Sequence, residues 1–277
     1  MQELNLKPNI SGKAQVSRRS TRAAQTLRLR AEEYLSYASD VKTALIEKGY
    51  SFNASEDIHI SARLRPSLQS FLSECVDLPA DKYCSEGTRK RRHTRLILFP
   101  WEQQLLHWPK NSYFQDTAIN QDAAGVAREF APLTETMLGN EFLRRLILTD
   151  FNQTPFAAAD LQLPFDVGLH VIKTIPRPGL AAVASPNCLH KDTEPFTFIH
   201  LLERENIVGG ENIITDNAKE PLFIATLKEL MDTIVVKDDA VYHHVMPINL
   251  VNPNAPGFRT VLLIDFTPMR SAVNQYS

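Results

Sequence analysis

Histidines and an acidic residue that could hold a metal ion gather in one part of the chain. Five of the eight histidines lie between residues 170 and 244. The sharpest pattern is His190-Lys191-Asp192, because side chains two residues apart on an extended chain point to the same side. A third ligand could come from His243 or His244, but only from one of them, since successive strand residues face opposite ways. Two imidazoles and one carboxylate form the facial triad typical of non-haem Fe(II).

An arginine further along the chain strengthens the case for a metal site. On their own, His190 and Asp192 could equally be a surface pair at the start of a strand. Arg259, however, opens an apolar strand at residues 260–264, and a charge that enters a buried strand needs a partner. A dicarboxylate co-substrate that chelates the metal at one end would offer its far carboxylate to this guanidinium. An internal ion pair, for example with Asp265, is the alternative.

The elements that must position these residues are mainly short strands. Apolar, β-rich runs occupy residues 167–175, 196–202, 212–215, 233–236, 241–248 and 258–266. Turn signals such as Gly209-Gly210 and Asp238-Asp239 lie between them. Many short strands without intervening helices predict a sandwich, a jelly roll or a barrel.

The first half of the chain is predicted to be helical and mixed. Ser20 suits the N-cap of a helix that would end near Gly49, because apolar residues recur between them at helical spacing. A second helix should begin with Pro66 and run to about Cys75, and residues 132–150 should form a third. We therefore expect these helices to pack on a C-terminal β-barrel.

A basic run at residues 89–95 carries five cations in seven residues and leads into an apolar strand. Alternation along that strand would place Arg91, His93 and Arg95 on one face, toward an anionic small molecule or toward solvent. Nucleic acid is the other partner to consider, but the net charge of -2 gives no electrostatic footprint for it. We therefore expect no nucleic-acid partner.

Composition narrows the class of protein further. The chain has 277 residues, 43% of them apolar, which is typical of a globular protein able to enclose a dry site. No apolar run reaches the roughly 18 residues that span a membrane. Three cysteines cannot pair evenly and show no CxxC spacing, so a reduced, cytoplasmic location is expected. The basic residues 1–19 are predicted to be a flexible tail, with a transit peptide as the alternative.

Most of the chain beyond about residue 70 resembles the 2-oxoglutarate/Fe(II)-dependent dioxygenases, in particular the bacterial branch of L-isoleucine and L-leucine hydroxylases. The segments that carry the resemblance are residues 81–83, 113–115, 125–130, 190–192, 198–201, 206–211, 242–248 and 259–266. The resemblance implies an α+β fold, with helices packed around a double-stranded β-helix of the jelly-roll or cupin type. Residues 20–277 would form one domain, with a support region at 20–164 and the β-helix core at 165–270.

The resemblance also implies a role for each residue of the candidate metal site. His190, Asp192 and His243 become the ligands of Fe(II), and His244 stands where the family usually has Gly. Arg259 takes the distal carboxylate of 2-oxoglutarate. Because Asp192 is present, halogenation is disfavoured, since halogenating relatives lack the carboxylate ligand.

Further contacts are assigned on weaker grounds. Thr260 and His200 are expected to contact the co-substrate, and Arg91 is a rival for the substrate carboxylate. The residues expected to contact the substrate are Arg128, Gln115, Asp116, His170 and Phe198. For His170 and His200, a hydrogen-bonded core histidine is the alternative.

These features together lead us to expect an enzyme that uses Fe(II), 2-oxoglutarate and O2, aided in vitro by ascorbate. It would hydroxylate a free, small aliphatic L-amino acid and release succinate and CO2, in general metabolism or natural-product biosynthesis. A carrier-bound or peptidyl substrate, desaturation and cyclisation are alternatives within the same chemistry. A non-catalytic β-barrel that binds a small molecule or senses metal is an alternative of another class. A hydrolytic zinc site would leave Arg259 without a purpose.

Overall fold

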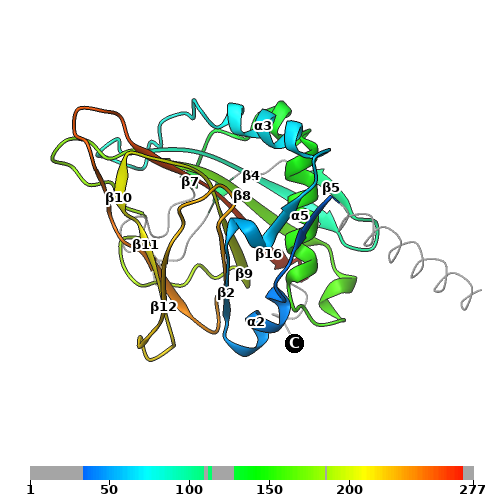
Figure 1. Cartoon of the computed structure of the whole chain (residues 1–277). Coiled ribbons are helices and arrows are strands. Elements are labelled where there is room, and N and C mark those ends of the chain that lie inside the picture. The colour runs from blue at the N-terminus through cyan, green and yellow to red at the C-terminus, as the bar shows by residue number, and fades with distance from the viewer. Residues whose placement is uncertain (1–33, 109–111, 114–127, 185, 271–277) are drawn as a thin grey trace, which may run out of the picture.

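The main layer of the fold is a seven-stranded antiparallel sheet with the strand order β2-β13-β9-β16-β8-β4-β5. The computed structural model describes residues 34–108, 112–113, 128–184 and 186–270 (Figure 1). The strands of the main sheet are β2 (Tyr50–Asn53), β4 (Arg89–Phe99), β5 (Gln104–His107), β8 (Phe165–Thr174), β9 (Phe196–Glu205), β13 (Thr233–Lys237) and β16 (Phe258–Pro268).

A smaller layer of strands faces the main sheet. It contains a three-stranded sheet in the order β12-β11-β14 and the antiparallel pair β10-β15. The bounds are β10 (Ile207–Gly209), β11 (Glu211–Thr215), β12 (Pro221–Thr226), β14 (Tyr242–Val245) and β15 (Ile248–Leu250). Two further antiparallel pairs join β1 (Leu35–Tyr37) to β3 (Ile58–Ile60) and β6 (Ser112–Tyr113) to β7 (Arg128–Glu129).

Helices cover the other side of the main sheet. They are α2 (Val41–Glu47), α3 (Arg65–Glu74), α4 (Glu135–Leu138) and α5 (Glu141–Gln153), with short 3-10 turns at Ser55–Asp57 and Asp160–Gln162. In Figure 1, α3 and α5 lie on the side of the sheet away from β10, β11 and β12. None of the helices in the described part of the chain is long and apolar enough to cross a membrane.

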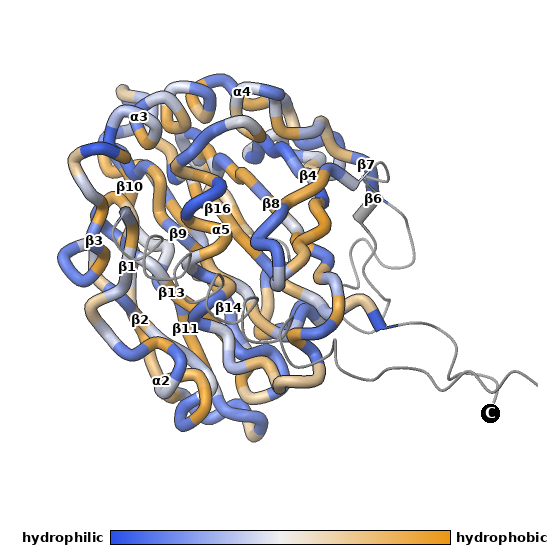
Figure 2. Tube along the Cα trace, turned by 90° about the vertical axis from the view of Figure 1, so that its right-hand side faces the viewer, coloured by the Kyte–Doolittle hydropathy of each residue, from blue (hydrophilic) through white to orange (hydrophobic). Residues whose placement is uncertain are grey.

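Strand alternation gives the main sheet two different faces. On β16, Leu262, Ile264 and Phe266 belong to the large apolar cluster that also contains the buried side chains of α3 and α5. Val261 on the same strand belongs to a second cluster, which reaches Ile214 of the smaller sheet. Figure 2 shows the resulting hydrophobic stretches along β8 and β16 and the hydrophilic residues of the peripheral loops. The space between the two sheets is therefore separate from the helix-covered core.

The predicted helix that would run from Ser20 to Gly49 is wrong over residues 34–40 and correct over Val41–Glu47, and its predicted N-cap, Ser20, lies outside the described residues. Leu35–Tyr37 form strand β1, which pairs with β3, and helix α2 begins only at Val41. Asp40 caps this helix, since its carboxylate accepts a hydrogen bond from the Thr43 backbone N–H at 3.0 Å. The pairing with β3 and the cap therefore override the helical spacing. The expected end is confirmed, because Gly49 has a φ of 78°.

Other predicted elements are confirmed, with three corrections. Helix α3 and the strands β4, β8, β9, β13 and β16 lie where the sequence predicted them. The third predicted helix, over residues 132–150, is two helices, α4 and α5, which are separated at Gly139 and Asn140. The predicted strand at 241–248 is two strands, β14 and β15, which pair with β11 and β10 and are separated at Met246 and Pro247. The first half of the chain also supplies more than helices, because it contributes β2, β4 and β5 to the main sheet.

Candidate metal centre and cavity

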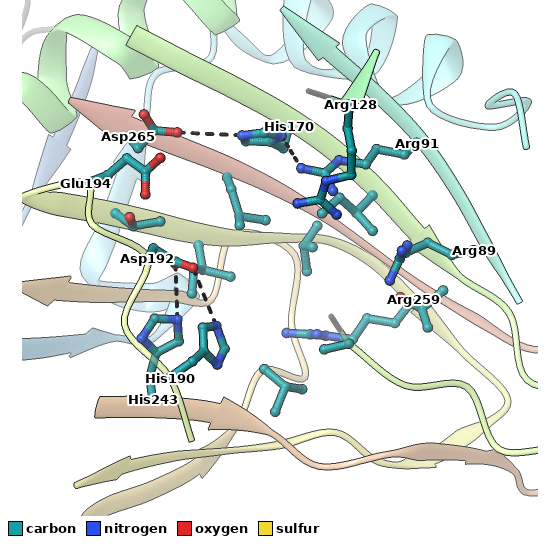
Figure 3. A pocket seen from close by; sticks show the side chains of 18 residues that line it. Arg89, Arg91, Arg128, His170, His190, Asp192, Glu194, His243, Arg259 and Asp265 are labelled. Carbon is teal, nitrogen blue, oxygen red and sulfur yellow. Dashed lines mark hydrogen bonds and ion pairs between the residues drawn. The ribbon is translucent and has the colours of Figure 1, made fainter. Parts of the chain in front are cut away.

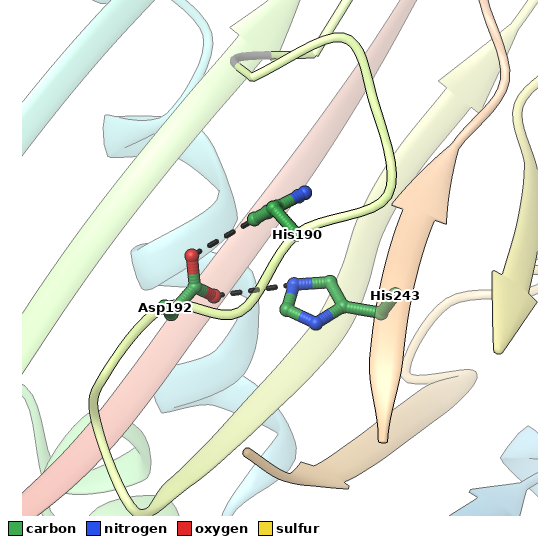
Figure 4. Close-up of side chains that lie close together, drawn as sticks. All are labelled: His190, Asp192 and His243. Carbon is green, nitrogen blue, oxygen red and sulfur yellow. Dashed lines mark ion pairs between the residues drawn. The ribbon is translucent and has the colours of Figure 1, made fainter. Parts of the chain in front are cut away.

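Three side chains converge where the loop before β9 meets β14. His190 and His243 form an antiparallel bridge, with backbone N–H···O distances of 3.1 and 3.0 Å, so their side chains project to the same side. The Asp192 carboxylate lies between the imidazoles, 3.4 Å from Nε2 of His190 and 3.2 Å from Nε2 of His243 (Figure 4). One ligand atom from each residue lies within 4.8 Å of the others, which suits a single metal ion.

Neighbouring groups hold this cluster in place. The Nδ1 atom of His190 lies 2.8 Å from the Cys188 carbonyl oxygen, to which it donates in the tautomer that leaves Nε2 as a metal ligand. The Asp238 carboxylate accepts hydrogen bonds from the backbone N–H groups of Asp192 and Thr193, at 2.6 and 3.1 Å. Asp238 is thus an orienting residue that the sequence did not reveal.

The charges of the cluster favour cation binding. Burial acts to raise the pKa of Asp192, but His243 and His190 outweigh it and hold this pKa below its ordinary value. Burial acts to lower the pKa of His190, but Asp192 outweighs it and raises this pKa. The carboxylate is therefore ionised next to two imidazoles. His244, one residue further along β14, pairs with Ile213 and is not part of the cluster.

The cluster lies at a cavity of about 110 Å³ between the sheets, and the register of the main sheet sets the cavity's floor. Ile172 on β8, Val261 and Leu263 on β16, and Ile199 on β9 form an apolar middle. Polar residues occupy the ends and the wall toward β4. They include Thr174 and the residues labelled in Figure 3 outside the metal cluster, which are Arg89, Arg91, Arg128, His170, Glu194, Arg259 and Asp265.

Arg259 lies at one end of the floor, where it pairs in register with Thr174. It is only 6% exposed, and its Nε and Nη2 atoms have no hydrogen-bond partner among the described residues. Burial and the positive charge of Arg204 lower the pKa of Arg259 to about 10. Asp265, the internal partner considered from the sequence, lies at the other end of the floor and accepts a hydrogen bond from the Gly168 N–H. The guanidinium of Arg259 therefore lacks a carboxylate partner within the described chain and suits an anionic ligand.

A wall of cations lies along β4 and β7. Arg89 is paired with Asp81 at 2.5 Å, whereas Nη2 of Arg91 lies 2.5 Å from Nδ1 of His170. Arg91 and Arg128 lie over the ring of Phe130, at 4.2 and 5.8 Å from its centroid. Burial, together with the nearby positive charges, keeps the pKa of His170 well below its ordinary value, so the imidazole is neutral. Two side chains of the predicted basic strand, those of Arg89 and Arg91, thus line the cavity. Those of Lys90, Arg92 and Arg95 bind Asp77, the Pro132 carbonyl oxygen and Asp166 instead.

Two acids at the opposite end of the cavity were not predicted as site residues. Burial and then the charges of Asp265 and Asp192 raise the pKa of Glu194. Burial raises the pKa of Asp265 to about 7, against the opposing effect of Arg95. The sequence carried one signal, which was the position of Asp265 inside an otherwise apolar strand.

Three residues predicted to contact the ligands do not line the cavity. Thr260 lies between the lining residues Arg259 and Val261, and Phe198 lies between Thr197 and Ile199 in the same way. Because successive strand residues face opposite ways, both side chains turn away from the site.

His200 also turns toward the helices. Its Nε2 lies 2.8 Å from the carboxylate of Asp150 on α5, and its Nδ1 lies 2.8 Å from the Thr233 hydroxyl. It is therefore the hydrogen-bonded core histidine considered as the alternative. Gln115 and Asp116 lie outside the described residues, so their expected contacts remain predictions.

The two-layered β fold and the His-Asp-His cluster are typical of iron-dependent oxygenases, and comparisons with known proteins agree. A family model described as 2OG-Fe dioxygenase matches residues 73–265, and the chain belongs to this family. Its members are enzymes that require Fe(II), 2-oxoglutarate and O2.

Two curated relatives and two solved structures are similar to the chain. An L-isoleucine-4-hydroxylase from Bacillus thuringiensis is 29% identical over 184 residues, which are 65% of this chain and 75% of that protein. A 3(1)-hydroxy-L-isoleucine 4-dioxygenase from Pantoea ananatis is 29% identical over 236 residues, which are 81% and 94% of the two chains. The crystal structure of IDO from Bacillus thuringiensis has a TM-score of 0.70 at 23% identity and covers 84% of this chain and 96% of that chain. A bsmA homolog from Methylobium petroleophilum gives 0.69 at 19% identity, with 83% and 92% covered. These structures support the double-stranded β-helix fold.

The residues present fit the metal and co-substrate of the family. Two imidazole nitrogens and one carboxylate form a donor set suited to Fe(II), and Arg259, which has no carboxylate partner among the described residues, offers a buried cation to a dicarboxylate. When bound, iron with 2-oxoglutarate and O2 supplies the oxidising chemistry, while the protein supplies orientation and a cavity with an apolar floor.

Proposed function

We propose that the chain hydroxylates an unactivated C–H bond of a free, small aliphatic L-amino acid. O2 and 2-oxoglutarate are consumed, and the hydroxylated amino acid, succinate and CO2 are formed, so that one oxygen atom enters each organic product. The observation that carries this proposal is the guanidinium of Arg259, which lacks a carboxylate partner in the described part of the chain and lines the same cavity as His190, Asp192 and His243.

The proposed roles follow from this arrangement. His190, Asp192 and His243 hold Fe(II), and Arg259 binds the distal carboxylate of 2-oxoglutarate through charge-assisted hydrogen bonds. Thr174, which lies beside Arg259 and lines the cavity, takes the supporting place first expected of Thr260. The ionised Asp192 balances part of the metal's charge, while Asp238 holds the backbone of the ligand loop.

Several features support an aliphatic amino acid as the substrate. The apolar floor formed by Ile172, Ile199, Val261 and Leu263 suits a branched side chain and excludes water from it. Arg128, with Arg91 beside it, provides positive charge for the substrate carboxylate. The two curated relatives are named for isoleucine and a hydroxylated isoleucine, which belong to the same chemical class.

The test is a panel of free L-amino acids incubated with the protein, Fe(II), 2-oxoglutarate and ascorbate and analysed by mass spectrometry. We expect at least one aliphatic or thioether amino acid to gain about 16 Da, with succinate formed in equal amount. Asp192→Ala is the inactive control. Modification of a carrier-bound or peptidyl substrate, with no free amino acid modified, would instead favour the alternative substrate class.

A further inference from the structure

Two carboxyl groups face the same end of the cavity, and no lysine or arginine in the described part of the chain forms an ion pair with either of them. Asp265 is 5% exposed, and its Oδ2 lies 3.7 Å from Nε2 of the neutral His170. The Oε2 atom of Glu194 is buried and has no hydrogen-bond partner among the described residues. Figure 3 shows both side chains at the end of the cavity opposite Arg259, next to Asp192.

The backbone of β8 makes room for the Asp265 carboxylate. Gly168 pairs in register with Asp265, and its N–H donates to Oδ1 at 3.2 Å. A Cβ atom at position 168 would overlap Oδ2 of Asp265, so a side chain at this position would push the carboxylate out of place. The strand therefore holds a buried acid in a fixed position on the cavity floor.

The cationic side chains nearest to Asp265 interact with other residues. Arg95 lies in the same cross-strand row as Asp265, but its guanidinium is bound to Asp166 through two nitrogens. Arg91 directs Nη2 at His170. Buried carboxylates without a cation are costly, and a ligand that brings a positive charge would remove this cost.

We propose that Glu194 and Asp265 bind the ammonium group of the amino acid substrate. This inference rests on the proposed function and deepens it. An ammonium group offers three donors, and the carboxylate oxygens that face the cavity accept them. With the ammonium at this end and 2-oxoglutarate at Arg259, the substrate side chain lies over the apolar floor near Asp192. An N-acylated amino acid or a peptidyl residue lacks this charge and should be rejected.

The test compares an amino acid with its 2-hydroxy acid, which keeps the carboxylate and the side chain but replaces the ammonium with a hydroxyl. The preferred amino acid of the panel and its hydroxy analogue are assayed with the wild type, Glu194→Gln and Asp265→Asn. The wild type should favour the amine in kcat/KM by about 100-fold or more, and each variant should reduce this preference by about 10- to 100-fold. Glu203→Gln is the matched control, because Glu203 is an acid of β9 that does not line the cavity and whose nearest cation is Lys173 at 3.9 Å.

A second variant and a binding measurement separate recognition from folding. Gly168→Ala leaves both acids in the sequence but displaces the Asp265 carboxylate, so it should also lower the preference for the amine. Binding of Mn(II) and 2-oxoglutarate, measured by calorimetry, should change less than about threefold in Glu194→Gln and Asp265→Asn, since the charge removed belongs to the substrate site.

The outcomes are distinct. If the wild type modifies an amino acid but both charge-removing variants retain its full preference for the amine, this inference is overturned and the proposed function stands. If the wild type modifies no free amino acid, the proposed function itself fails.

Discussion

Strand register decides whether His243 or the adjacent His244 is the third metal ligand. His190 lies directly opposite His243 in an antiparallel bridge, whereas the next residue, His244, pairs with Ile213 and projects elsewhere. His243→Ala should therefore reduce succinate formation by more than about 100-fold, while His244→Ala should retain substantial turnover. Succinate quantified by chromatography makes the comparison. An inactive His244 variant beside an active His243 variant would reverse the ligand assignment.

Arg259 is the residue on which the co-substrate assignment depends. A charge-assisted hydrogen-bonded pair contributes roughly 1.5–3 kcal/mol, so Arg259→Ala should raise the KM for 2-oxoglutarate about 10- to 150-fold. Arg259→Lys should recover part of the loss, because it restores the charge without the bidentate geometry. Initial rates measured across 2-oxoglutarate concentrations test both variants, and Mn(II) affinity is the control. An unchanged KM for 2-oxoglutarate would show that Arg259 does not bind the co-substrate and has a structural role.

At the scale of the strands, a stacked pair of buried histidines makes the free energy of unfolding depend on pH. His93 on β4 stacks on His170 on β8 with ring centroids 4.1 Å apart, and burial, followed by the charge of Arg91, lowers the pKa of His93 to about 3. An unfolded histidine titrates near 6.5, so between pH 6.5 and 3 the unfolded state binds more protons and stability falls as the pH falls.

Replacing His93 should weaken this dependence on pH. We expect the loss of unfolding free energy between pH 7 and 5 to be about 2 kcal/mol smaller in His93→Phe than in the wild type. Urea unfolding at the two pH values measures the difference. An identical loss in both proteins would show that His93 is already protonated in the folded state.

The positions of the strands were predicted from the sequence more accurately than the face of the sheet on which each side chain lies. β8, β9 and β16 show strong apolar runs, and these runs identify buried strands whatever their neighbours are. A strand buried on both sides has no polar face, however, so the run Phe198-Ile199-His200 does not reveal that only Ile199 faces the cavity.

The helix predicted over Leu35–Tyr37 failed for a related reason. The apolar spacing there suits a helix, but pairing with β3 depends on residues more than twenty positions away in the chain. The meeting of the two acids at the end of the cavity likewise depends on contacts between residues that are far apart in the chain. Glu194 precedes β9 by two residues, and the pairing of β9 with β16 brings it to the same end of the cavity as Asp265, which one sequence does not specify.

At the scale of the whole molecule, the site joins parts of the chain that are far apart. Arg91, Asp192, His243 and Arg259 come from β4, a loop, β14 and β16, so their geometry depends on the two sheets staying together. Ligands that bind this assembled site should therefore stabilise the entire fold. We propose that residues 20–277 form one domain, which predicts a single unfolding transition.

Thermal unfolding with ligands tests this coupling. Mn(II) and 2-oxoglutarate together should raise the Tm more than Mn(II) alone, because a ligand at 100 times its Kd contributes about 2.7 kcal/mol. Arg259→Ala should keep the increment from Mn(II) and lose most of that from 2-oxoglutarate. Differential scanning calorimetry records both increments. Two separate transitions, or equal responses of wild type and variant, would argue against one assembled site.

The most direct test of the proposed hydroxylation is the fate of labelled oxygen. The protein is incubated under 18O2 with Fe(II), 2-oxoglutarate and the amino acid that the panel selects. We predict that the amino acid gains about 18 Da instead of 16 Da, because it receives one atom of the labelled O2. Succinate should carry the other labelled atom, and the two labelled products should form in a one-to-one ratio. An amino acid that gains unlabelled oxygen, or succinate that forms without any change in the amino acid, would contradict a dioxygenase that hydroxylates this substrate.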